Sequence, residues 1–206
     1  MAENLYLMMN KPCGYVCSAL SDSHKTVYDL LTPDLQKLVQ GAKRGHRLHT
    51  IGRLDCDTSG LLLLTTDGNF SHHLTASKSI GGGEVKKTYR VLLENPLSKE
   101  VQADYILKAA AGLTLPPEKK APEQKASPAQ IIFLNERSES EASTSNLCYI
   151  TITEGKFHEV RRLFRALGNE VLELERISIG NLSLPENLKP GTWRKLTEEE
   201  KSLLIV

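Results

Sequence analysis

Three segments of the chain carry side chains whose types and spacing could do chemistry. The first places Arg53, Asp55 and Asp57 on a short glycine-bounded stretch that runs directly into the apolar residues 61–64. Such a stretch can put a carboxylate at the edge of a core, where loss of water and a chosen cation set its reactivity. Taken alone, however, the segment is better explained as a capped turn with a surface ion pair.

The second and third segments combine cations with an aromatic residue or an apolar stripe. Tyr89 lies among Lys and Arg in residues 86–91, where it could pack, stack on a base or move a proton. In residues 154–165, Arg161 flanks the apolar stripe of a helix and could reach a buried acid, whereas Arg162 and Arg165 are predicted to face solvent or phosphate. In isolation, a cross-strand aromatic and an ordinary amphipathic helix explain these two segments.

The elements that must position these segments alternate irregularly between strands and helices. The best-defined helix begins near His158, because apolar residues recur at positions 160, 163, 164 and 167, and it ends at Gly168. A capping box of Thr197 and Glu200 precedes a last helical turn. Further strands are predicted at 5–10, 61–64, 88–94, 130–134, 147–153 and 171–177, further helices at 26–31 and 97–111, and surface loops at 114–130 and 135–146.

This order of elements predicts an α/β (α+β) fold in one domain over residues 1–206, with a mixed, largely antiparallel sheet and flanking helices. Lys and Arg number 26 against 25 Asp and Glu, so overall charge gives no hint of nucleic acid. The start of the chain does not have the pattern of a signal peptide, and no apolar run could span a bilayer. Four cysteines without a paired framework indicate a cytoplasmic enzyme with free thiols, and the Cys13/Cys17 pair lacks the partners that a zinc site needs.

The three segments, occurring together and in this order, resemble motifs of the RsuA-type ribosomal family of pseudouridine synthases. The similarity extends from about residue 5 to residue 204 and has a highly specific motif set. It rests on Gly52-Arg53-Leu54-Asp55 followed by Thr58-Ser59-Gly60-Leu61, on Lys87-Thr88-Tyr89, on Gly155-Lys156-Phe157-His158-Glu159-Val160-Arg161-Arg162, on the opening Asn10-Lys11-Pro12-x-Gly14, and on the closing Gly180, Gly191, Arg194, Leu196 and 197–200.

The sequence departs from this family pattern in three ways. Glu159 stands where the family usually has Gln, so an acceptor charge replaces a hydrogen-bond donor. Lys156 replaces an Arg and loses its bidentate geometry. Most relatives also carry a small N-terminal S4 RNA-binding module, whereas this chain begins almost at the catalytic domain, so a member without the S4 domain is expected.

The resemblance implies the pseudouridine synthase fold and an isomerase that needs no cofactor and no metal. Asp55 would be the catalytic carboxylate, paired with Arg161, and Tyr89 would stack on the uracil and could move a ribose proton. Asp55 would either attack C1′ or assist a glycal-type intermediate, and the sequence leaves both routes open. The residues expected to bind RNA are Arg53, Lys11, Thr58, His158, Arg162, Arg165 and Leu174.

The expected partner is ribosomal RNA or a ribosomal precursor particle, with no membrane and with a monomeric protein. Residues 14–18, 70–75 and 155–158 are most similar to the small-subunit branch, and large-subunit rRNA and tRNA are the alternatives. A non-catalytic RNA-binding or assembly factor with the same fold is a rival hypothesis. A hydrolase with Asp55 and Asp57 as a carboxylate pair is another, but the two acids lie too close together on one loop to flank a sugar.

Overall fold

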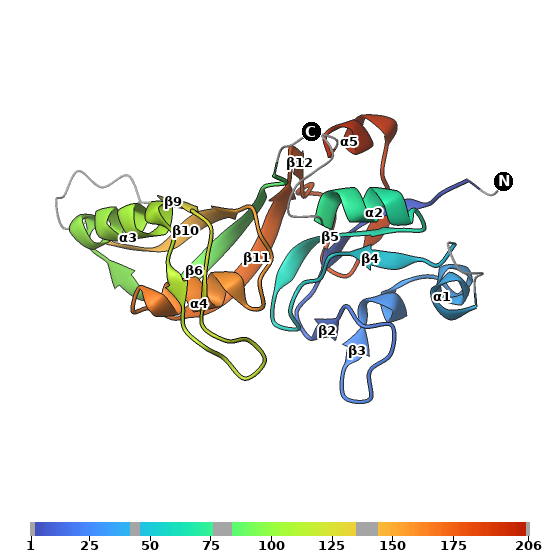
Figure 1. The fold of residues 1–206 in the computed structure, drawn as a ribbon. Coiled ribbons are helices and arrows are strands. Elements are labelled where there is room, and N and C mark those ends of the chain that lie inside the picture. The colour runs from blue at the N-terminus through green and yellow to red at the C-terminus, as the bar shows by residue number, and fades with distance from the viewer. Residues whose placement is uncertain (1–2, 42–45, 76–83, 135–143, 205–206) are drawn as a thin grey trace. The chain divides into compact units, whose positions relative to one another are not determined.

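The computed structural model describes residues 3–41, 46–75, 84–134 and 144–204 (Figure 1). Its contacts divide the chain into two compact units, of which the first contains Met1–Val85 and Arg176–Val206 and the second contains Lys86–Glu175. The sequence gives no sign of this division, and each unit is described here by itself. Of the predicted loops, most of 135–146 lies outside the described residues, and positions 145–146 already belong to a strand.

The first unit is built on three long-range antiparallel strand pairings. β1 pairs with β5 and with β13, and β4 pairs with the other edge of β5. Its elements are β1 (Tyr6–Lys11), β2 (Tyr15–Val16), β3 (Lys25–Thr26), η1 (Val27–Leu30), α1 (Pro33–Gln40), β4 (His49–Ile51), β5 (Ser59–Thr65), α2 (Gly68–Thr75), β12 (Leu182–Ser183), β13 (Trp193–Lys195) and α5 (Glu198–Ser202).

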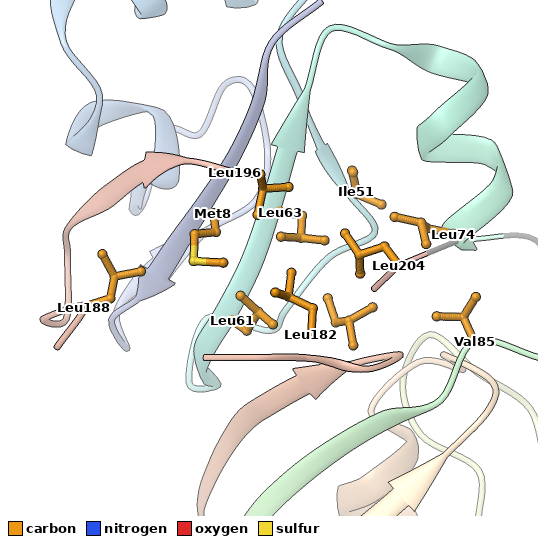
Figure 2. Packing of buried hydrophobic residues seen from close by; sticks show 11 residues of the cluster. Met8, Ile51, Leu61, Leu63, Leu74, Val85, Leu182, Leu188, Leu196 and Leu204 are labelled. Atoms are coloured by element: carbon orange, nitrogen blue, oxygen red, sulfur yellow. The ribbon is translucent and has the colours of Figure 1, made fainter. Parts of the chain in front are cut away.

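The core of the first unit forms around β5, whose four consecutive leucines, residues 61–64, are fully buried. A continuous apolar run of this length is typical of a strand that is covered on both faces. Leu61 and Leu63 point into a cluster with Met8 from β1, Leu74 from α2 and Leu204 near the C-terminal end (Figure 2). Since β5 begins four residues after Asp55, this core anchors one end of the segment that carries Arg53, Asp55 and Asp57.

The second unit contains an antiparallel sheet in the order β6-β10-β9. Every second residue of β6 from Tyr89 to Leu93 is buried, as are alternate residues of β10, and α3 packs against β9. The elements are β6 (Lys87–Leu97), α3 (Lys99–Ala111), β7 (Thr114–Leu115), β8 (Gln124–Lys125), β9 (Gln130–Phe133), β10 (Ser145–Ile152), α4 (Glu159–Ala166) and β11 (Val171–Ile179), whose residues from Arg176 onward belong to the first unit.

These elements confirm the predicted fold class of a mixed, largely antiparallel sheet with helices. The main differences lie in two segments. Residues 27–30 form a 3₁₀ helix, and residues 114–130, predicted as a surface loop, contain the β7–β8 hairpin with Leu115, Ala121 and Ala126 buried. No helix within the described ranges is long and apolar enough to cross a membrane.

Candidate active site

In the first unit, Asp55 opens a tight turn that connects the stretch after β4 to β5. The Thr58 amide donates to the Asp55 carbonyl at 3.1 Å, so Cys56 and Asp57 occupy the corners of the turn. Gly52 precedes the turn with a φ of 66°, a left-handed value that glycine adopts without strain. The Asp55 side chain is half-buried, whereas Asp57 is exposed. The turn therefore separates two nearby acids into different environments.

Lys11 holds this turn from inside the protein. Its side chain is completely buried, and its Nζ donates to the carbonyls of Thr58 at 2.7 Å, Asp55 at 3.0 Å, Pro12 at 3.1 Å and Cys56 at 3.4 Å. Burial lowers the pKa of the Lys11 ammonium, and nearby thiols and Asp55 oppose that shift. The expectation that Lys11 contacts phosphate is wrong, because its charge is already used on backbone carbonyls.

The start of β5 is fixed by a close approach of two backbones. A Cβ at Gly60 would collide with the Arg176 carbonyl oxygen, so no other residue fits there without a shift of the backbone. Arg176 is itself buried, and its Nε donates to the Leu61 carbonyl at 2.8 Å. Sequence reasoning missed this arginine. The available signal was its position in β11 two residues after the buried Leu174, which puts both on one face of the strand.

In the second unit, Tyr89 lies on β6 opposite Ile150 of β10 and is buried. Two positions earlier on the same face, the Lys87 Nζ donates to the carbonyls of Thr153 at 3.4 Å and Glu154 at 3.3 Å. These bonds connect the start of β6 to the segment that leads into α4. The Lys-x-Tyr motif and the basic helix are therefore tied together within this unit.

The basic helix α4 begins at His158 in an unusual way. His158 has a φ of 47°, the one positive value of a non-glycine residue among the described residues, and its ring stacks on Phe157 with centroids 3.8 Å apart. Its Nδ1 lies 3.1 Å from Glu118 Oε1 of the β7–β8 hairpin. A strained αL conformation that neighbours hold in place is often found at functional sites.

The helical wheel predicts that Arg161 is more buried than Arg162, but the structure shows the opposite. Arg162 is completely buried, and its guanidinium donates to the carbonyls of Pro122 at 2.7 Å, Pro116 at 2.8 Å and Phe157 at 3.2 Å. The prediction that it faces solvent or phosphate is therefore wrong. Arg161 is half-buried and donates from Nη1 to the Val171 carbonyl at 2.9 Å.

The remaining predicted contacts differ in exposure. Arg53 is exposed, and Arg165 keeps 41% of its side chain accessible while its Nε binds Glu170 Oε1 at 3.0 Å. Leu174 is buried on β11, and Thr58 is buried in the Asp55 turn. Within the described ranges, the Thr58 hydroxyl has no hydrogen-bond partner.

The predicted site residues fall into one set in each unit. Lys11, Arg53, Asp55 and Thr58 belong to the first unit, and the Lys11 contacts join the last two of them through one turn. The second unit holds Tyr89, His158, Arg161, Arg162, Arg165 and Leu174. Among the residues that the structure describes, no group of three or more His, Cys, Asp or Glu side chains is placed to hold a metal ion.

Comparison with known proteins identifies this arrangement. The family model described as RNA pseudouridylate synthase matches residues 5–166. The chain belongs to the RNA pseudouridylate synthase family. It is 39% identical over 195 residues to the ribosomal small subunit pseudouridine synthase A of Salmonella typhimurium, covering 95% of this chain and 71% of that protein. The protein of the same name from Escherichia coli K12 is 37% identical, with 97% of this chain and 74% of that protein covered.

A solved structure of a pseudouridylate synthase shares the fold. It superposes with a TM-score of 0.80 at 36% identity and covers 100% of this chain and 75% of that chain. The predicted pseudouridine synthase fold and the predicted enzyme class, an isomerase, are confirmed by these comparisons.

Glu159 stands at the position where the family resemblance predicts Gln. The side chain is buried at the start of α4, and its Oε2 accepts from the Lys156 amide at 2.8 Å. Burial raises the pKa of the Glu159 carboxyl, and the neighbouring Glu154 adds to the shift, whereas Lys156 and Lys87 oppose it. Its ionised form is therefore less favourable in the folded protein than in the unfolded chain.

We expect Glu159→Gln to stabilise the protein near neutral pH. Stability from a raised carboxyl pKa is fully present below the unfolded value, here 4.5, and is lost as pH rises through the folded value. The neutral Gln avoids that loss and still accepts from the Lys156 amide, so the gain is on the order of 1 kcal/mol. Urea unfolding at pH 7.5 and pH 4 measures it, with the exposed Glu173→Gln as control. An equal gain at both pH values would contradict the explanation.

Proposed function

We propose that this protein converts uridine to pseudouridine at a specific position of small-subunit ribosomal RNA. The observation that carries the proposal is Asp55 on a turn that Lys11 fixes through backbone carbonyls, within a motif set of the RNA pseudouridylate synthase family. The names of the bacterial relatives support the small subunit as the substrate class. The three stretches at 14–18, 70–75 and 155–158 favour the same branch.

The proposed reaction breaks the N1–C1′ bond of a flipped-out uridine, turns the uracil and joins C5 to C1′. Asp55 is the carboxylate that acts at C1′, either as a nucleophile or by assisting a glycal-type intermediate. Its half-buried position on a rigid turn suits both routes, because a carboxylate held in a fixed geometry needs little reorganisation. The product is an isomer of the substrate, so no cofactor has to supply or remove atoms.

Arg161 and Tyr89 complete the proposed catalytic set from the second unit. The family resemblance assigns Arg161 as the partner of Asp55, a role in which a cation would keep the acid ionised and aimed. Its anchor on the Val171 carbonyl limits the positions that its guanidinium can take. Tyr89 stacks on the uracil ring, and its hydroxyl could move the ribose proton that a glycal route requires.

The proposed RNA-binding set is smaller than the one expected from sequence. Lys11 and Arg162 leave the set, because both have structural roles. The set keeps Arg53, Arg165, His158, Thr58 and Leu174. Arg53 is an exposed cation that could fill the space left by the flipped nucleotide. The substrate would be ribosomal RNA or a precursor particle bound by a monomer, and four free thiols suit a reducing, cytoplasmic compartment.

Release of tritium from uracil C5 tests this function, because the new C5–C1′ bond must expel that hydrogen to water. We expect the purified protein to release tritium from a small-subunit rRNA transcript or particle and not from a matched large-subunit transcript. Release from the large-subunit transcript alone would reassign the substrate. RNA binding without release from transcripts or precursor particles would favour the rival hypothesis of a non-catalytic assembly factor.

A further inference from the structure

Two accessible thiols lie at the Asp55 turn, one within the turn and the other on the segment that follows β1. Of the four free cysteines, Cys17 and Cys148 are buried, whereas Cys13 is exposed and Cys56 is half-buried. Cys13 follows the end of β1, and Cys56 is the residue directly after Asp55. Oxidation of a thiol depends on its accessibility, so Cys13 and Cys56 are the pair that an oxidant can reach.

The backbones that carry these two thiols are already in contact. The Gly14 amide donates to the Cys56 carbonyl at 2.8 Å, and the Lys11 Nζ binds both the Pro12 carbonyl, at 3.1 Å, and the Cys56 carbonyl, at 3.4 Å. Adding the covalent distances at each end of the 2.8 Å bond keeps the Cα atoms of Cys13 and Cys56 within roughly 8 Å. Disulfides span Cα separations of about 4.4–6.8 Å, so the two backbones are close enough for a shift of one loop to join the thiols.

The other two thiols are poor competitors for this bond. Burial raises the pKa of the Cys17 thiol, which also lies 3.4 Å from the Leu54 amide nitrogen. Burial raises the pKa of Cys148 to about 12, and that residue belongs to the second unit. Thiols that stay protonated and buried react slowly. Oxidation of the first unit is therefore directed to one pair.

We propose that Cys13 and Cys56 form a reversible disulfide under peroxide stress and that this bond switches the enzyme off. One thiolate attacks a peroxide oxygen, the O–O bond breaks, and the sulfur becomes a sulfenic acid while hydroxide leaves. The second thiolate then attacks that sulfur and expels a second hydroxide. The protons that the two thiols lost on ionisation convert the two hydroxides to water. Two thiols are thus oxidised by two electrons as one hydrogen peroxide is reduced, and an external dithiol reverses the bond.

The effect on activity follows from the position of Cys56 and rests on the proposed function of Asp55. Closing the disulfide pulls the corner of the turn toward Cys13, while Lys11 holds the ends of the turn at Asp55 and Thr58. The Asp55 backbone must therefore rotate or shift. A misplacement of about 1 Å can cost on the order of 10²-fold in rate, so we expect at least a tenfold loss of activity. Transient, redox-sensing disulfides are the kind that reducing compartments tolerate.

The test treats the purified protein with hydrogen peroxide, blocks the remaining thiols and maps disulfide-linked peptides by mass spectrometry. Tritium release from the rRNA substrate is followed in parallel, before and after dithiothreitol. Cys13→Ser and Cys56→Ser are the matched variants, because each retains a similar volume and lacks one partner. Both are expected to have wild-type activity when reduced and to keep it after peroxide.

We expect a 13–56 cross-link, a loss of activity in the wild type only, and full recovery on reduction. Oxidation of both thiols to separate acids, without a cross-link, would overturn the proposal. So would a cross-link that leaves activity unchanged, because the bond would then not control the turn. The cross-link is measured by mass alone, so an absence of synthase activity would count against the proposed function and not against the disulfide.

Discussion

Replacing Asp55 with Asn is expected to abolish pseudouridine formation while the protein still folds and binds RNA. Asn has almost the same shape, and the Asp55 carbonyl that Lys11 holds belongs to the backbone, so the turn should survive. The amide cannot supply the carboxylate charge that either route requires. We expect the tritium-release rate to fall by at least about 10³-fold, as is usual when a group central to the chemistry is removed.

The matched control is Asp57→Asn in the same turn. Asp57 is exposed at a corner of the turn, and the proposed mechanism gives it no role, so activity should stay within a few-fold of the wild type. Filter binding of the rRNA and circular dichroism verify that both variants are intact. Equal loss in both variants, together with free uracil as the product of the wild-type protein, would favour the carboxylate-pair hydrolase. Turnover by a clean Asp55→Asn preparation would remove the central claim.

The elements that sequence predicted well are those in which local pattern and tertiary packing agree. The run of leucines at 61–64 predicts a strand that is buried on both faces, and these residues form the buried part of β5. The Thr197 and Glu200 capping box was predicted from spacing alone. Both of its hydrogen bonds form. The Glu200 amide donates to the Thr197 hydroxyl at 3.2 Å, and the Thr197 amide donates to the Glu200 carboxylate at 2.9 Å. The hairpin in 114–130 was missed, since its polar, Pro-rich composition is typical of a loop.

The site was predictable in its motifs but not in the burial of its cations. Lys11 was assigned to RNA by the family resemblance, and Arg162 was assigned to solvent or phosphate because the helical wheel points it away from the apolar stripe. Both are buried against backbone carbonyls instead, and most of those carbonyls come from distant parts of the chain: residues 55–58 for Lys11, and residues 116 and 122 for Arg162. Neither periodicity nor composition contains information on such pairings. In the structure, Lys11 and Arg162 therefore hold backbone segments in place, a role that the sequence did not predict.

The strongest consequence of this correction concerns Lys11, which we expect to control both stability and activity. Lys11→Met keeps a similar unbranched shape but removes the donor from four carbonyls, including those of Asp55 and Thr58. Burying the Lys11 charge itself costs free energy, so removing that charge offsets part of the destabilisation caused by the lost hydrogen bonds. The unsatisfied carbonyls outweigh that gain, and we expect the free energy of unfolding to fall by on the order of 2–4 kcal/mol. Urea unfolding with the exposed Lys25→Met as control measures this difference.

The activity of Lys11→Met separates an organiser of the turn from a phosphate contact. A phosphate contact would mainly weaken RNA affinity and reduce its salt dependence. An organiser of the Asp55 turn would lower the rate of tritium release at saturating rRNA, under conditions where the variant is fully folded, and leave the salt dependence unchanged. We expect the second result, because the Lys11 ammonium is buried and lies 3.0 Å from the carbonyl of the proposed catalytic residue. A change confined to affinity would restore the assignment that the sequence alone suggested.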